Sequence, residues 1–105
     1  MENETPIYRI LMLEKPVTFD QFGWPEYGRE EDVGFYYEEE TALKAARENW
    51  ADINECGSYQ ALLVEKLKPG LYPIAHYCGY FVWNKKTQQF DEQIIPEQLR
   101  SYSII

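Results

Sequence analysis

Two side chains with catalytic potential, His76 and Cys78, lie two positions apart in the chain. On an extended segment both point to the same face, so the imidazole is placed to take the thiol proton and create a thiolate nucleophile. A productive pair also needs an orienting third group and an oxyanion site, and no glycine-rich turn or helix start adjoins Cys78. We therefore expect a protein that is not an enzyme, with Cys78 buried and His76 on a loop. An enzyme that uses His76 and Cys78 stays an alternative.

The sequence offers few groups for a metal or a phosphate. Two cysteines and one histidine are fewer than the four ligands of a structural zinc site. The acidic triplets at 30–32 and 38–40 lack the alternate spacing and the turn glycine of a calcium loop. The glycines do not follow the spacing of a phosphate-binding loop. We expect no cofactor and no metal site.

The position of the charge is more informative than its total. The chain has 105 residues and a net charge of −8, which argues against direct binding to nucleic acid or to an anionic membrane. Residues 26–40 carry seven acids and one base, whereas residues 61–90 carry four lysines and one acid. Aromatic residues are interspersed among the acids of the first segment. Acids steer a basic partner and aromatics supply buried anchors, so this combination is typical of a protein-binding surface.

We therefore predict an acidic, aromatic face within residues 20–40 that binds a basic protein surface, such as that of a nucleic-acid-binding enzyme. The residues expected on this face are Trp24, Glu26, Tyr27, Glu30, Glu31, Asp32, Tyr36, Glu38 and Glu39. The alternative is that the aromatics belong to the core and the acids are their solvated neighbours.

In size and charge the chain resembles phage-encoded inhibitors of host or defence enzymes, including anti-CRISPR proteins, and immunity proteins against nuclease toxins. This resemblance implies a non-enzymatic inhibitor. The N-terminal residues lack the basic and apolar regions of a signal peptide, and two cysteines are few for a small secreted domain. We expect a cytoplasmic protein.

The elements that must position these residues follow from apolar patterning. The chain is short enough to form one domain, residues 1–105. A helix is expected over 39–56, with Leu43, Ala46, Trp50 and Ile53 on its buried face and Gly57 after its end. The other expected segments are strands at 7–14, 34–37, 59–67, 79–84 and 88–94, irregular connections at 16–33 and 71–77, a turn at 85–87 and a short helix at 97–102.

This order predicts a two-layer α+β fold, in which one main helix covers a mostly antiparallel sheet of three to five strands and a short C-terminal helix follows. The continuous apolar run within 59–67 predicts that this strand is central.

Two further hypotheses remain. A small-ligand-binding domain would close the 16–33 loop and the 69–78 connection over a cleft lined by Trp24, Tyr72, Tyr77 and Trp83. A homodimer would join the positive 61–90 region to the acidic segment of a second copy, or pair an exposed edge strand at 88–94.

Overall fold

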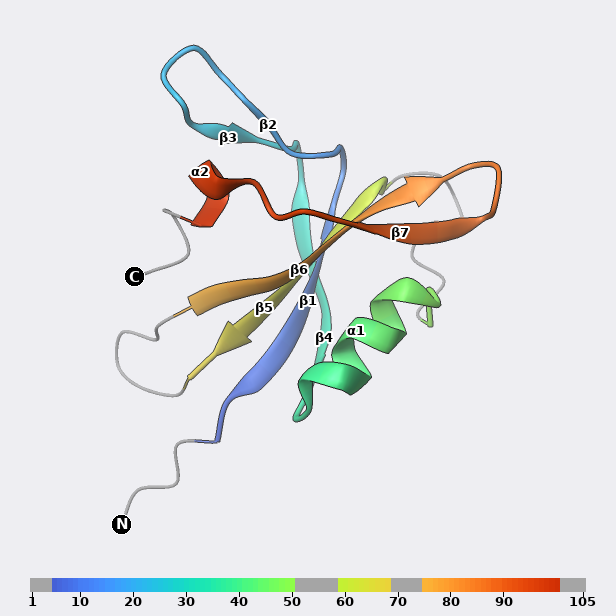
Figure 1. The fold of residues 1–105 in the computed structure, drawn as a ribbon. Coiled ribbons are helices and arrows are strands. Elements are labelled where there is room, and N and C mark those ends of the chain that lie inside the picture. The colour runs from blue at the N-terminus through green and yellow to red at the C-terminus, as the bar shows by residue number, and fades with distance from the viewer. Residues whose placement is uncertain (1–4, 51–58, 69–74, 101–105) are drawn as a thin grey trace.

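The computed structural model describes residues 5–50, 59–68 and 75–100. They form a mixed α+β fold built on a five-stranded antiparallel sheet and one main helix (Figure 1). The strands are β1 (Ile7–Leu13), β2 (Thr18–Phe19), β3 (Pro25–Glu26), β4 (Glu30–Tyr36), β5 (Ala61–Leu67), β6 (Ala75–Asn84) and β7 (Gln89–Gln93), and the helices are α1 (Glu39–Arg47) and the single turn α2 (Glu97–Arg100).

The sheet has the strand order β4-β1-β5-β6-β7. The apolar strand β5 lies at its centre, as its sequence predicts, because only a strand with neighbours on both sides and covered faces can bury a continuous apolar run. The strands β4 and β7 form the two edges. The short strands β2 and β3 pair with each other and form a separate arm between β1 and β4.

Both faces of the sheet carry a core. On one face, which we call the helix face, Tyr8 and Ile10 of β1 pack with α1 and with Phe81 and Phe90. Side chains of alternate residues point to the opposite face, which we call the arm face. The buried residues of the arm face are Leu11, Leu13, Ala61, Leu63, Tyr80 and Leu99, and the residues packed against them include Val17, Phe19 and Tyr27.

We expected two layers, with one main helix covering the sheet. That arrangement does not account for a core on the arm face, because α1 packs on the helix face. Figure 1 shows the β2–β3 arm and α2 next to each other at the end of the sheet away from α1. Leu99 of α2 and Phe19 of the arm both contribute to this core. The arm is also joined to the sheet by a hydrogen bond that Val17 N donates to the Tyr80 hydroxyl at 2.9 Å. Of the C-terminal helix expected over 97–102, residues 97–100 form α2, and residues 101 and 102 lie outside the described part of the chain.

Two strands begin earlier than we predicted. The prediction of an irregular connection throughout 16–33 is wrong, because β2 and β3 form the arm and β4 begins at Glu30. Acidic residues disfavour strands intrinsically, but pairing along the whole of β1 outweighs this preference. The connection expected over 71–77 is also too long, since β6 begins at Ala75 and pairs with β5 from there.

The main helix is shorter than the predicted 39–56. Asn49 adopts a left-handed conformation with φ of 54°, its N–H donates to Ala46 O at 3.2 Å, and Trp50 N donates to Ala45 O at 3.0 Å. This pair of bonds is a Schellman motif, which terminates a helix. The helix therefore ends at Arg47, and Trp50 leaves the buried stripe and is 50% exposed. The predicted residues Ile53 and Gly57 lie outside the described part of the chain.

Candidate functional site

The residues predicted to bind a partner are distributed over three elements. Trp24 and Glu26 lie on the arm, and Tyr27 lies between β3 and β4. Four of the residues lie on β4 (Glu30, Glu31, Asp32 and Tyr36), and two lie at the start of α1 (Glu38 and Glu39). All of the predicted acids are exposed, as is Trp24. Tyr27 and Tyr36 are half-buried and pack against the two cores, so they serve the fold as well as the surface.

The three acids of β4 do not share one face. Register with β1 places Glu30 opposite Leu13 and Asp32 opposite Leu11. These two leucines belong to the arm-face core, so both acids lie on the arm face. Glu31 lies opposite Met12 on the helix face. Successive residues of a strand point in opposite directions, so a contiguous acidic triplet on a strand charges both sides of an edge rather than one patch.

On the arm face, the acids of β4 join a network of internal contacts. Tyr27 donates its hydroxyl hydrogen to Glu30 Oε1 at 2.8 Å. Arg9 donates from Nε to Glu65 Oε1 at 3.1 Å, and the same Nε lies 3.3 Å from Asp32 Oδ1. Glu65 is only 5% exposed, so the Arg9 guanidinium is the cation that keeps this buried carboxylate paired.

The network also affects the tyrosines around it. Burial, reinforced by the charges of Glu65 and Glu30, raises the pKa of Tyr77 to about 12. Burial and the hydrogen bond to Glu30 raise the pKa of Tyr27 as well. Both phenols therefore stay protonated near neutral pH, and Tyr27 acts as a hydrogen-bond donor. The network is a stable polar support beneath β4 rather than an acid–base pair.

A pocket lies beside β4 where the strand bulges. The register shifts between Ile10 and Leu11 of β1, so Val33 is an extra residue on β4, and the following Gly34 has φ of 155°, a conformation that favours glycine. The pocket has a volume of about 210 Å³. Its lining residues are Ile10, Val33, Gly34, Phe35, Tyr36, Ala45 and Trp50.

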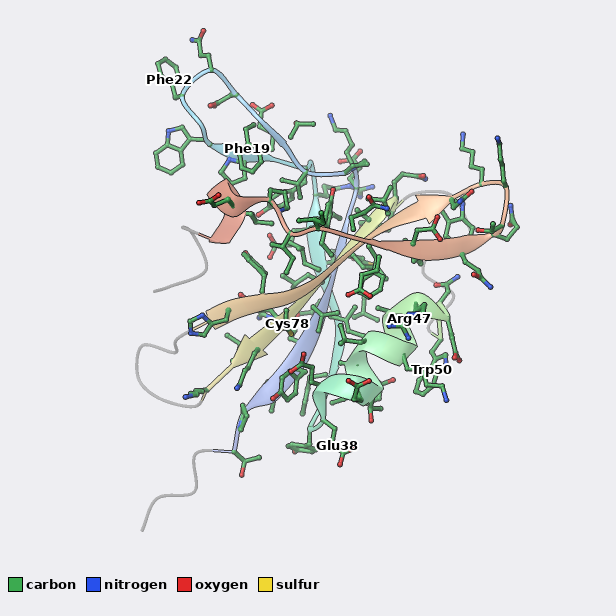
Figure 2. All side chains as sticks on the ribbon, in the orientation of Figure 1. Phe19, Phe22, Glu38, Arg47, Trp50 and Cys78 are labelled. Carbon is green, nitrogen blue, oxygen red and sulfur yellow. The ribbon has the colours of Figure 1, made fainter. Side chains whose placement is uncertain are left out.

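Trp50 forms one wall of this pocket. Its ring packs edge-to-face against Tyr36, with 6.0 Å between ring centroids, and its indole N–H donates to Glu48 Oε1 at 2.8 Å. Figure 2 shows Trp50 at the C-terminal end of α1. Sequence patterning assigned Trp50 to the core, and the available signal against that assignment was Asn49, a residue that tolerates the left-handed cap conformation.

The arm presents two exposed aromatics on an ordered turn. Asp20 Oδ1 accepts hydrogen bonds from Phe22 N at 2.8 Å and from Trp24 N at 3.0 Å, and Asp20 N donates to Trp24 O at 3.0 Å. Phe22 is 75% exposed and Trp24 is 57% exposed. Figure 2 shows Phe22 at the tip of the arm, far from the helix face, and Phe19 at its base. Trp24 was predicted from the sequence to belong to the site, whereas Phe22 was not.

The structure does not favour the alternative in which His76 and Cys78 form a catalytic pair. The Cys78 thiol donates to Val64 O at 3.5 Å and packs against the helix-face core. Burial raises the pKa of this thiol to about 11, with a further contribution from the charge of Glu39. A nucleophilic cysteine needs a lowered pKa, so the environment of Cys78 is that of a structural residue. His76 is exposed on β6, which corrects its expected place on a loop.

The residues of the expected ligand cleft are separated. Tyr77 packs against the arm-face core and Trp83 against the helix-face core, where its ring lies 4.9 Å from that of Phe90. These two side chains therefore lie on opposite sides of the sheet and do not line one cleft. Trp24 is on the arm, and Tyr72 lies outside the described residues.

Within 5–50, 59–68 and 75–100, no three His, Cys, Asp or Glu side chains are grouped so that they could hold a metal ion. In the same residues, no helix has the length and apolar character needed to cross a membrane.

Comparison of the chain with models of protein families gave no matching family, and comparisons with curated proteins and with solved structures gave no significant match.

Proposed function

We propose that this chain is a non-enzymatic binding protein that engages a basic surface of another protein through β4 and the β2–β3 arm. The observation that carries the proposal is the position of the acidic segment. It forms an edge strand with exposed carboxylates, where a partner has access to it. An acidic edge that served solubility alone would have no need of exposed aromatic side chains next to it.

Exposed aromatics at both ends of this surface support the proposal. Phe35 and Tyr37 form an edge-to-face pair with 5.5 Å between ring centroids, and both are at least half exposed. Phe22 and Trp24 occupy the ordered tip of the arm. Aromatic side chains held in place before binding lose little conformational entropy when a partner covers them, which makes them effective anchors.

A nucleic-acid-binding protein is the partner class that we propose. The groove that binds phosphates in such a protein is lined by lysine and arginine, and the acids of β4 and of the start of α1 supply the opposite charge. In this form the chain is an inhibitor of the anti-CRISPR or immunity-protein kind, because it occupies the groove in place of nucleic acid.

The test compares two variants of equal net charge. In the first, the β4 acids are neutralised (Glu30→Gln, Glu31→Gln and Asp32→Asn). In the second, three acids of β7 and α2, outside the proposed surface, are neutralised (Asp91→Asn, Glu92→Gln and Glu97→Gln). Wild type and both variants are immobilised, and proteins captured from an extract of the source cells are quantified by mass spectrometry over a range of salt concentrations.

We expect the wild type and the control variant to capture the same basic proteins and the β4 variant to lose them. The salt dependence of capture should also become weaker for the β4 variant, because fewer charges are paired on binding. Equal capture by all three proteins would contradict the proposed function, since only the position of the charge differs between the variants.

A further inference from the structure

The outer edge of β4 has backbone groups in position for another strand. In the described residues, β4 pairs with β1 on one side and with no strand on the other. Glu14 N donates to Arg29 O at 2.9 Å, just before β4 begins. Backbone groups of successive strand residues point to alternate sides, so those of Glu31 face β1 and those of Glu30 and Asp32 face outward.

Beyond the bulge, the backbone groups of β4 again point alternately toward β1 and outward. Gly34 and Tyr36 lie opposite Ile10 and Tyr8, whose backbone groups face β4, and the backbone groups of Phe35 therefore face outward. Donors and acceptors are thus available on both sides of the bulge. An extended peptide laid along β4 would find hydrogen-bonding partners at three positions.

The two faces of this edge favour different side chains. On the helix face, the pocket between β4 and Trp50 lies next to the bulge and is lined mainly by apolar and aromatic side chains. On the arm face, the carboxylates of Glu30 and Asp32 flank the edge. A strand added here presents its side chains alternately to the two faces, so the edge selects a peptide in which basic and apolar residues alternate.

We propose, on the basis of the function proposed above, that β4 binds an extended basic segment of the partner as a sixth strand of the sheet. One apolar side chain of that segment occupies the pocket beside Trp50, and the lysine or arginine residues at alternate positions toward the start of β4 point toward Asp32 and Glu30. Backbone hydrogen bonds supply affinity, and the pocket and the carboxylates supply specificity.

A second copy of the chain is a poor occupant of this edge. Pairing of β4 with itself would bring the carboxylates of Glu30, Glu31 and Asp32 close to those of the other copy, and like charges across a strand pair are destabilising. The other edge strand, β7, carries Asp91 and Glu92 and has the same sign of charge. Charge complementarity therefore favours a basic segment from a different protein.

The test uses synthetic peptides of seven residues, the length of β4, with blocked ends. The first alternates lysine with leucine. The second and third have the same sequence but carry N-methyl groups on the lysine amides or on the leucine amides. A fourth has alanine in place of the central leucine. Each is titrated into the full ¹⁵N-labelled chain, and amide and indole N–H signals are followed by NMR.

We expect the first peptide to shift the amides of Glu30, Asp32 and Phe35 and the indole N–H of Trp50. One N-methylated peptide should bind about tenfold more weakly than the other, because only one set of amides faces β4. Alanine in place of leucine, or Trp50→Ala in the protein, should each weaken binding severalfold through loss of the pocket contact. The spectrum of the Trp50→Ala variant itself reports whether that variant is folded.

Equal binding of both N-methylated peptides, or shifts located away from β4, would overturn this inference. The capture experiment above does not depend on strand addition. If the β4 acids are needed for capture but the peptides do not pair with β4, the function stands and the sixth strand is wrong. If capture does not depend on the β4 acids and the peptides do not pair with β4, both proposals are wrong.

Discussion

The two edge strands of the sheet are attached to the molecule in different ways. β7 inserts Phe90 into the helix-face core, where it is 1% exposed and packs against Trp83, and Glu92 of β7 pairs with Arg47 of α1 at 3.6 Å. β4 has no fully buried residue. It is held by its backbone ladder to β1, by the half-buried Val33 and Tyr36, and by the polar contacts of Glu30 and Asp32.

This difference distinguishes a strand that stabilises the fold from a strand that mainly presents a surface. Burial of an aromatic ring contributes several kcal/mol, whereas exposed polar contacts contribute about 1 kcal/mol or less each. β7 therefore belongs to the cooperative core of the fold. The exposed side chains of β4 can differ without loss of the fold, which is what an interaction surface requires.

The largest expected effect is that of Phe90→Ala on β7, with Phe35→Ala on β4 as the comparison. Phe90→Ala should lower the free energy of unfolding by about 3–5 kcal/mol, because it leaves a cavity in the core. Phe35→Ala, at a position that is 50% exposed, should change it by less than about 0.5 kcal/mol. Urea denaturation followed by circular dichroism measures both. Similar losses for the two variants would show that β4 is part of the core.

An intermediate effect is expected at the bulge. Gly34→Ala should lower the free energy of unfolding by about 1–2 kcal/mol, because an L-residue is strained at a φ of 155° even though no atom lies within 4 Å of the added methyl group. Gln89→Ala on β7, at an exposed position, is the matched control and should be nearly neutral. An unchanged denaturation midpoint for Gly34→Ala would mean that the bulge does not constrain the backbone of β4.

The smallest effect is expected for the ion pair between β7 and α1. Both side chains of Arg47 and Glu92 are about half exposed, so Arg47→Gln should cost less than about 1 kcal/mol and its effect should decrease in high salt. Thermal unfolding at low and high ionic strength measures it. A larger, salt-independent loss would show that β7 is held by this pair rather than by Phe90.

Regular apolar patterning predicted the parts of the fold that are deeply buried. The strand at 7–14, the central strand at 59–67 and the hairpin around 85–87 correspond to β1, β5 and the β6–β7 pair. In each of these segments, the apolar pattern of the local sequence agrees with the burial of the segment in the folded structure. The start of the main helix at Glu39 was also predicted, because acids in the first turn interact favourably with the helix dipole.

The parts that sequence did not predict depend on tertiary context. β4 has an unfavourable sequence for a strand and exists because β1 needs a second neighbour. The end of α1 depends on the backbone conformation of Asn49, and it moves Trp50 from the expected core to the wall of the pocket. The acids of the candidate site were correctly predicted to be exposed, but their division between two faces follows from the register of β4.

The turn at the tip of the arm has a consequence for evolution and for engineering. Its backbone is fixed by Asp20 and by main-chain groups, and the side chains of Gln21 and Phe22 are exposed. Residues at those positions can be exchanged without loss of the interactions that define the turn. The tip is therefore a site at which natural variation or grafted sequences can change the exposed surface of the chain while the sheet stays the same.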